Sequence, residues 1–391
     1  MEFKEDESSE KTCSKKAIIV LLIFVFFIIA SIIVIVVLVK KTKNEIGDYY
    51  LSEKICETDS NGREICYRKI NVNVEHYIQE LSGNVKRTHV RYDNRYGITL
   101  AADLYTPKSL DKKKKYKGLV IGPPYGGVKE QGPSVYANYF AQHDFVVVAF
   151  DPSFNGESGG KNRKVSSSDI FMEDFSASVD YLGTLSYVDR EKIGAIGICG
   201  SGGFLLGAAT IDKRIKAIVT VSLYDIPEVS YNKSESDWEK SMDDLKNQRW
   251  DDVDKGTQQY EIVYESDRVY ENNQYPIKNE ESEIWCPFYS TERGHHARST
   301  GGFTFISGFS ILNLQVTRNI EKIRPRQVLL LAGSEAHSIN YTYEIGDRLE
   351  KDFYNISIVP GANHIDLYDN IEKIPFKDIF DFLNEYLNKN I

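Results

Sequence analysis

Cys199 stands in a glycine-rich turn whose residue types and spacing suit covalent catalysis. The apolar residues 193–198 predict a buried strand, and Gly-Ser-Gly-Gly follows the cysteine at 200–203. A side chain on a tight turn between a strand and a helix is presented for attack on a carbonyl carbon, and glycines permit so sharp a turn. The N-terminus of the following helix is expected to lower the thiol pKa and favour the thiolate. We therefore predict that Cys199 is a nucleophile.

Ser201 is the alternative nucleophile, because a glycine also stands two residues after it, at Gly203. In that frame Cys199 fills the small-residue position two places before the nucleophile. The apolar strand ends at Ile198, so the next residue occupies the tip of the turn, which favours the cysteine. A buried, unreactive cysteine is the remaining interpretation of this position.

His364 is the predicted general base. A thiol nucleophile needs a group that accepts its proton and returns one to the leaving group. The histidine follows the last predicted strand, at 355–359, and precedes a predicted helix at 376–387. A nucleophile on such a turn is followed along the chain by an acid and then by a histidine, so this loop is the expected place.

Glu335 is the predicted acid, as the first carboxylate after the strand expected at 327–331. Its role would be to hold one imidazole tautomer and to stabilise the imidazolium. Asp366 is the fallback, although it lies only two residues from the histidine that it would have to orient.

Two backbone N–H groups are expected to form an oxyanion hole. Gly200 follows the nucleophile directly, and Tyr125 lies in the loop after the third predicted strand. Pro123 and Pro124 of that loop have no N–H to donate.

The elements that must position these residues follow an α/β pattern. Short apolar runs alternate with helical stretches, which indicates a mostly parallel sheet flanked by helices. The first two predicted strands form a hairpin. The predicted strands are 86–91, 98–105, 118–121, 145–150, 193–198, 215–221, 327–331 and 355–359, and the predicted helices are 134–142, 170–185 and 376–387.

Residues 223–324 interrupt this pattern. The interval is acidic at first and rich in Tyr and Trp later, and it is too long for a connection between two buried strands. We predict a mainly helical lid over the site, the alternative being a surface insertion without a role in catalysis.

The N-terminal region predicts a membrane anchor. Residues 17–39 are apolar apart from Ser31, and about 23 residues at about 1.5 Å each exceed the roughly 30 Å of a bilayer core. We expect a cytoplasmic tail at 1–16, a single transmembrane helix at 17–39, and a stalk with a hairpin at 40–83. Lysines flank both ends of the helix, so charge does not decide its orientation.

Cys56 and Cys66 bracket a hairpin turn predicted at Asn61-Gly62. A disulfide between them requires an oxidising compartment, whereas two free thiols would suit the cytosol. The disulfide is the prediction, and it places the catalytic domain outside the cytosol.

Composition excludes several classes of partner. The net charge of −9 argues against binding of nucleic acid. His295, His296 and His337 lack the spacing of metal ligands, so no metal and no cofactor are expected.

Residues from about 84 to 387 resemble the α/β-hydrolase superfamily, and within it the cysteine-nucleophile branch of dienelactone hydrolase and the fungal polyketide transferase-like hydrolases. The motifs that carry this resemblance are Gly126-Gly-Val-Lys-Glu-Gln131, 151–159, Gly197-Ile-Cys-Gly-Ser-Gly-Gly203, 332–338 and 360–368. The resemblance implies a core built from 84–222 and 325–391, with Cys199 and His364 as nucleophile and base. It also implies an acid at Glu335, where the superfamily more often has Asp, and Pro123 replaces a histidine found in many relatives.

The expected function is a membrane-anchored hydrolase that cleaves small-molecule esters or thioesters through an acyl-enzyme. An acyltransferase of the same fold and a catalytically silent binding or adhesion ectodomain are the alternatives. The first two require the Cys199 thiol to be reactive, whereas the third does not.

Overall fold

A computed structural model describes residues 51–58, 62–70, 76–231, 233–277 and 280–389. The predicted tail at 1–16 and membrane segment at 17–39 lie outside these residues. Within the described part of the chain, no helix combines the length and apolarity needed to cross a bilayer. The described residues within 54–68 and 76–389 form one compact unit that contains every predicted site residue.

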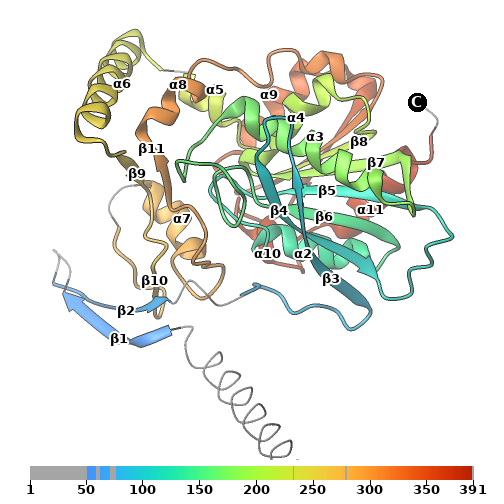
Figure 1. The fold of residues 1–391 in the computed structure, drawn as a ribbon, viewed down its shortest axis with the longest axis horizontal. Helices are drawn as coiled ribbons and strands as arrows, with labels where there is room; N and C mark the ends of the chain where they lie inside the picture. The colour runs from blue at the N-terminus through green and yellow to red at the C-terminus, as the bar shows by residue number, and fades with distance from the viewer. Residues whose placement is uncertain (1–50, 59–61, 71–75, 232, 278–279, 390–391) are drawn as a thin grey trace, which may run out of the picture. The chain divides into compact units, whose positions relative to one another are not determined.

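An eight-stranded sheet forms the centre of this unit, in the order β13-β12-β8-β7-β5-β6-β4-β3 (Figure 1). The pairs from β6 through β5, β7, β8 and β12 to β13 are parallel, and β4 is antiparallel to both β3 and β6. The predicted fold class, a mostly parallel sheet begun by a hairpin, is confirmed. The strands are β3 (Val85–Asp93), β4 (Thr99–Pro107), β5 (Tyr116–Gly122), β6 (Phe145–Phe150), β7 (Val188–Ile198), β8 (Ala217–Val221), β12 (Gln327–Gly333) and β13 (Tyr354–Val359).

Two apolar layers cover the sheet because successive strand residues point to opposite faces. Leu119 and Ile121 of β5 belong to one layer, with helices α2 (Gly132–Ala141), α10 (Asp366–Asp369) and α11 (Phe376–Tyr386). Val120, between them, belongs to the other layer, with α3 (Ser168–Thr184), α4 (Gly200–Ile211) and α9 (Ile339–Arg348). Helices on both faces explain why the central strands are continuous apolar runs.

The interval 223–324 contains short strands as well as the predicted helices. Strands β9 and β11 pair antiparallel, while β10 joins the sheet of β1 (Leu51–Thr58) and β2 (Glu64–Ile70). The elements of the interval are α5 (Ile226–Tyr231), α6 (Glu235–Lys255), β9 (Tyr260–Ile262), β10 (Arg268–Tyr270), α7 (Glu280–Tyr289), β11 (Gly302–Thr304), η1 (Phe305–Ser307), α8 (Gly308–Ile311) and η2 (Ile320–Ile323). The helices and strands from α5 to β11, together with α8, lie on one side of the central sheet, at the left of Figure 1, whereas η2 packs against α4.

The hairpin that precedes the core carries a disulfide between Cys56 and Cys66. The backbone N–H of Glu271, next to β10, donates to the carbonyl of Cys66 at 3.0 Å, and the ring of Tyr67 packs on that of Tyr270. The hairpin therefore contacts the lid interval directly.

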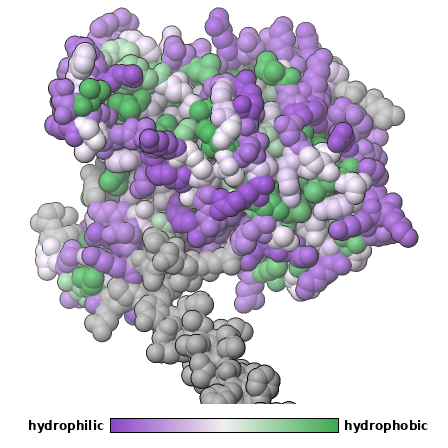
Figure 2. All heavy atoms as spheres, viewed as in Figure 1, coloured by the Kyte–Doolittle hydropathy of each residue, from purple (hydrophilic) through white to green (hydrophobic). Residues whose placement is uncertain are grey.

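The surface in Figure 2 is mostly hydrophilic, with apolar side chains in small separate groups. Trp250 and Val253 of α6 are the most exposed large apolar residues of the lid, each at 65%. Scattered apolar residues of this kind are ordinary on a folded protein and require no partner.

Candidate active site

Cys199 occupies the sharp turn between β7 and α4. Its backbone has φ 54° and ψ −121°, a conformation that side chains other than glycine rarely adopt. Close packing requires glycine at two nearby positions, Gly197 and Gly200. A Cβ on Gly197 would lie 2.4 Å from the carbonyl oxygen of Ser201, and one on Gly200 would lie 2.8 Å from the Cβ of Tyr125. The strained turn therefore brings the nucleophile candidate against the loop of Tyr125.

Three polar groups lie next to the sulfur of Cys199. They are the backbone N–H groups of Gly200 and Tyr125 and the hydroxyl of Tyr368, and each of them lowers the pKa of the thiol. The two N–H groups predicted to form the oxyanion hole, those of Gly200 and Tyr125, therefore both lie next to the thiol of Cys199 at rest.

The Cys199 thiol differs from the expectation in its acidity. Burial raises the pKa of Cys199 to about 11, and the three hydrogen bonds only partly oppose this effect. The expected lowering by the helix N-terminus is wrong because the side chain is only 3% exposed, and loss of hydration outweighs the helix field. The candidate nucleophile is therefore a protonated thiol at rest, and it would need a base to react.

His364 is buried beside this thiol. Its Nε2 lies 2.9 Å from the hydroxyl of Tyr368, and its Nδ1 lies 2.5 Å from Oγ of Ser338. Burial, and then the neighbouring His337, hold the pKa of His364 well below its usual value. The imidazole is consequently neutral at physiological pH and is able to accept a proton.

Tyr368 links the candidate base to the candidate nucleophile, and the sequence analysis did not single it out. It lies four residues after His364, in α10, and its hydroxyl reaches both the imidazole and the thiol. Burial raises the Tyr368 pKa, so the phenol stays protonated. The available signal was the four-residue spacing, which places two side chains on one face of a helical turn.

Glu335 is not brought to the imidazole. It lies in the exposed turn after β12, and among the described residues no hydrogen bond or ion pair holds its carboxylate. The turn directs the buried Ser338 inward instead, so a hydroxyl occupies the position expected for the acid. Asp366 is also elsewhere, paired with Lys373 at 2.7 Å and with Arg293 at 3.2 Å.

Ser201 lies in the first turn of α4 and faces away from this group. A Cβ on Gly122 would come within 2.9 Å of its Oγ, and the ring of Phe175 occupies the same space. No contact links Ser201 to His364 among the hydrogen bonds of the described residues. The geometry therefore favours Cys199 over Ser201.

Hydrogen bonds and a ring contact hold the loop of Tyr125 in place. The N–H of Thr300 donates to the carbonyl of Gly126 at 2.7 Å, and Tyr125 stacks on Phe303 with ring centroids 4.1 Å apart. The N–H of Lys129 donates to Asp151 at 2.8 Å. Donors held in place before the substrate arrives are those that stabilise developing charge best.

Lys129 anchors the far end of this loop by a buried ionic network. Its Nζ lies 2.5 Å from Glu130, 3.1 Å from Asp151 and 2.6 Å from Glu157. Burial alone would lower the Lys129 pKa, but the carboxylates raise it above its usual value. The ammonium is therefore charged, and removal of it would leave the buried carboxylate of Asp151 without a counter-ion, whereas Glu130 would keep its ion pair with Arg298.

Two bacterial proteins resemble this chain over most of its length. The uncharacterized protein PA2218 of Pseudomonas aeruginosa is 42% identical over 318 residues, which are 78% of this chain and 82% of PA2218. The crystal structure of PA2218 matches with a TM-score of 0.74 and covers 79% of this chain and 96% of that one. The uncharacterized protein YcjY of Escherichia coli is 36% identical over 282 residues, which are 71% of this chain and 90% of YcjY.

A fungal enzyme of known fold completes the comparison. The crystal structure of alpha/beta hydrolase GrgF from a Penicillium species matches with a TM-score of 0.64 at 17% identity, covering 77% of this chain and 99% of GrgF. The chain therefore has the α/β-hydrolase fold, and it belongs to one family with PA2218 and YcjY. A thiohydrolase from Eupenicillium brefeldianum is 30% identical to this chain over 135 residues, which are 34% of the chain and 42% of the thiohydrolase. No protein-family model matches the chain.

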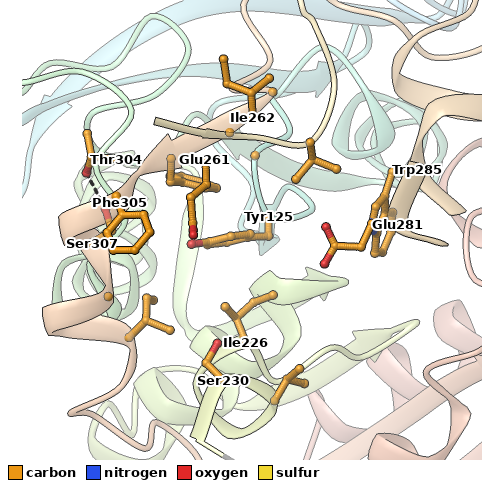
Figure 3. A pocket seen from close by; sticks show the side chains of 18 of the residues that line it. Tyr125, Ile226, Ser230, Glu261, Ile262, Glu281, Trp285, Thr304, Phe305 and Ser307 are labelled. Atoms are coloured by element: carbon orange, nitrogen blue, oxygen red, sulfur yellow. Dashed lines mark hydrogen bonds between the residues drawn. The ribbon is translucent and has the colours of Figure 1, made fainter. Parts of the chain in front are cut away.

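A cavity of about 670 Å³ opens above Cys199. Figure 3 shows its walls, which come from β9, α5, α7 and η1 around the ring of Tyr125. Its volume lies within the usual range for binding sites of small molecules. The labelled wall residues are Ile226, Ser230, Glu261, Ile262, Glu281, Trp285, Thr304, Phe305 and Ser307.

The histidines outside the site do not form a metal centre. Burial lowers the pKa of His295 to about 4 and that of His296 to about 3, so both are neutral. Among the described residues, the one group of possible metal ligands that lie close enough together is Cys56, Glu64 and Cys66, and its two sulfurs form the disulfide.

Proposed function

We propose that this α/β hydrolase cleaves ester or thioester bonds through an acyl-enzyme formed on Cys199. The observation that carries the proposal is the convergence on one sulfur of two backbone N–H groups and a tyrosine that is hydrogen-bonded to a neutral histidine. Among the partial relatives are proteins named thiohydrolase, acyltransferase and polyketide transferase, which supports acyl chemistry.

The first half of the proposed cycle begins with transfer of a proton. Tyr368 gives its hydroxyl proton to Nε2 of His364 and takes the thiol proton of Cys199. For this step the neutral imidazole carries its proton on Nδ1, which donates a hydrogen bond to Oγ of Ser338. Nε2 is then the nitrogen that accepts a proton. The sulfur then bonds to the substrate carbonyl carbon, and the carbonyl electron pair moves onto oxygen.

The oxyanion replaces the resting sulfur as the acceptor of the N–H groups of Gly200 and Tyr125. When the tetrahedral adduct collapses, the imidazolium returns its proton to the departing alcohol or thiol. The acyl group is then held as a thioester on Cys199. Water deprotonated by His364 attacks this thioester, releases the acid and restores the thiol.

Acyl transfer to an acceptor other than water is the second candidate. It uses the same acyl-enzyme and differs only in the nucleophile of the second half-reaction. The intact nucleophile, base and donors argue against a silent binding or adhesion ectodomain, because such a role needs none of them.

The test is hydrolysis of an ester and of a thioester by the full-length protein in detergent. Cys199→Ala is expected to abolish turnover, and Ser201→Ala is expected to retain most of it. Turnover that survives Cys199→Ala would overturn the thiol mechanism. Adding a thiol or alcohol acceptor and measuring the ratio of transfer product to free acid separates the two candidates.

We further propose that residues 17–39 anchor the enzyme and that its catalytic domain lies outside the cytosol. The apolar length of this segment and the Cys56–Cys66 disulfide, which needs an oxidising compartment, support the proposal. An impermeant amine-reactive label is expected to modify the catalytic domain in intact cells. Labelling only after permeabilisation would contradict this topology.

A further inference from the structure

The cavity above Cys199 has two distinguishable sides. Trp285 lies on the side of the base, because its ring centroid is 5.3 Å from that of His364. The opposite wall is formed by Phe303, which stacks on Tyr125, and by residues of α6 and α8. Since His364 must protonate the leaving group, the leaving group lies on the side of Trp285. The acyl group is therefore directed toward α6 and α8.

The acyl side of the cavity is closed by aliphatic side chains. Leu245 of α6 and Ile311 of α8 both line the cavity and are each only 6% exposed. Ile226 and Val229 of α5 line it as well. Contact of an acyl chain with these side chains gains free energy from burial of its methylene groups.

The charged groups of the cavity also limit its ligand. Three carboxylates line it, those of Asp244, Glu261 and Glu281, against one cation, Lys233. Figure 3 shows the side chains of Glu261 and Glu281 on either side of Tyr125. A negatively charged substrate would meet net repulsion on entering.

We propose that the cavity binds an uncharged, extended aliphatic acyl group, which lies between Phe303 and the side chains of Leu245 and Ile311 while its carbonyl carbon reaches Cys199. This inference rests on the proposed acyl-enzyme, and it adds the class of acyl group that the enzyme accepts. Acetyl groups and acyl chains that end in a carboxylate are poor substrates.

The first test is the dependence of kcat/KM on acyl length, measured with p-nitrophenyl acetate, butyrate, hexanoate, octanoate and decanoate. Each added methylene is expected to raise kcat/KM about fourfold, the factor that corresponds to about 0.8 kcal/mol, until the chain reaches Leu245 and Ile311. A profile that is flat or that peaks at acetate would overturn the proposal. The octanoyl ester is expected to exceed the matched half-ester of octanedioic acid by about tenfold or more, and Glu261→Gln with Glu281→Gln is expected to narrow this ratio.

Paired variants locate the acyl group. Ile311→Phe is expected to shift the optimum to a shorter chain, and Leu245→Ala to a longer one. Phe309→Ala and Lys246→Ala, at exposed positions of the same two helices, serve as controls and are expected to leave the profile unchanged. Because the two cavity variants shift the optimum in opposite directions, a general loss of folding cannot imitate the result. An optimum that stays in place in both variants would place the acyl group elsewhere.

Alkylation of Cys199 separates this inference from the proposed function. Iodoacetamide and N-octyl iodoacetamide each form a carbon–sulfur bond with expulsion of iodide, and the thiol proton passes to solvent. Peptide mass spectrometry measures both rates at Cys199. Faster reaction with the octyl reagent, lost in Ile311→Phe, supports the cavity assignment even if no ester is hydrolysed. Equal rates in an enzyme whose turnover depends on Cys199 would contradict the assignment and leave the proposed function standing.

Discussion

The hydroxyl of Tyr368 lies 2.9 Å from Nε2 of His364 and within hydrogen-bonding reach of the Cys199 sulfur. The proposed base therefore contacts the proposed nucleophile through a phenol. Burial keeps all three groups uncharged at rest, since it raises the pKa values of the thiol and the phenol and lowers that of the imidazole. Activation consequently depends on moving a proton when the substrate is attacked.

Tyr368→Phe tests this link. Because the substitution removes the hydroxyl and keeps the ring, we expect kcat for ester hydrolysis to fall about 100-fold or more, the usual contribution of positioned proton transfer. KM is expected to change little. Tyr136→Phe is a matched control, since this buried tyrosine donates instead to the carbonyl of Leu367. Full activity of Tyr368→Phe would show that His364 reaches the thiol without the phenol.

Ser338, and not Glu335, is expected to orient the imidazole. Ser338→Ala removes the partner of Nδ1 and should lower kcat/KM by about fivefold to tenfold, the worth of one neutral hydrogen bond. Glu335→Gln should stay within about twofold of the wild type, because the exposed carboxylate holds no partner among the described residues. A large loss in Glu335→Gln with none in Ser338→Ala would restore the glutamate as the acid.

The pH dependence of Cys199 alkylation follows from its pKa. With a pKa of about 11, the thiolate fraction at neutral pH is small and rises about tenfold for each pH unit below that value. The rate of reaction with iodoacetamide, followed on the Cys199 peptide, is therefore expected to keep rising above the pH at which an ordinary thiol levels off. The protein unfolded in guanidinium provides that reference. A rate that is already maximal near pH 7 would mean a preformed thiolate.

Gly200→Ala is expected to damage the oxyanion hole. The added Cβ would come 2.8 Å from the Cβ of Tyr125, so the two donors must separate. Loss of one such donor costs about 100-fold to 1,000-fold in kcat. Alkylation of Cys199 tests whether the nucleophile itself stays accessible in this variant. If Gly200→Ala retains wild-type kcat, the N–H groups of Gly200 and Tyr125 are not the stabilising donors.

Lys129→Met is expected to destabilise the fold. It leaves the buried carboxylate of Asp151 without its ammonium, while Glu130 keeps its pair with Arg298, and breaking a buried pair in this way costs about 3–5 kcal/mol. Denaturant unfolding measures this change in the free energy of unfolding. Lys377→Met, which breaks an exposed pair with Asp381, is the control and should change stability by less than about 1 kcal/mol. Equal effects of the two variants would contradict the role given to the buried network.

The parts of the site that sequence alone located are those fixed by local pattern. The turn at Cys199 and its following glycine are adjacent in the chain, and His364 follows a recognisable strand. Ser338 was missed because a turn of five residues decides which side chain faces inward, and only packing against β13 settles that. Tyr368 was missed because its second partner, the thiol, is distant in sequence.

The fold likewise contains features that local sequence pattern reveals and features that depend on packing. The buried strands of the central sheet were recognisable as apolar runs, whereas β9 and β11 of the lid are three residues long and carry no detectable periodicity. The thiol pKa was predicted with the wrong sign because sequence reveals a helix N-terminus but not how completely the lid and the Tyr125 loop exclude water.

The most direct test of the central claim is the identity of the acylated residue. Full-length protein is mixed with p-nitrophenyl octanoate, quenched in acid within the first turnover, digested and analysed by mass spectrometry. We expect an octanoyl group on the peptide of Cys199, bound as a thioester that neutral hydroxylamine removes. The amount of this acylated peptide is expected to be the same in Ser201→Ala. An octanoyl ester on Ser201, or turnover that continues in Cys199→Ala, would contradict it.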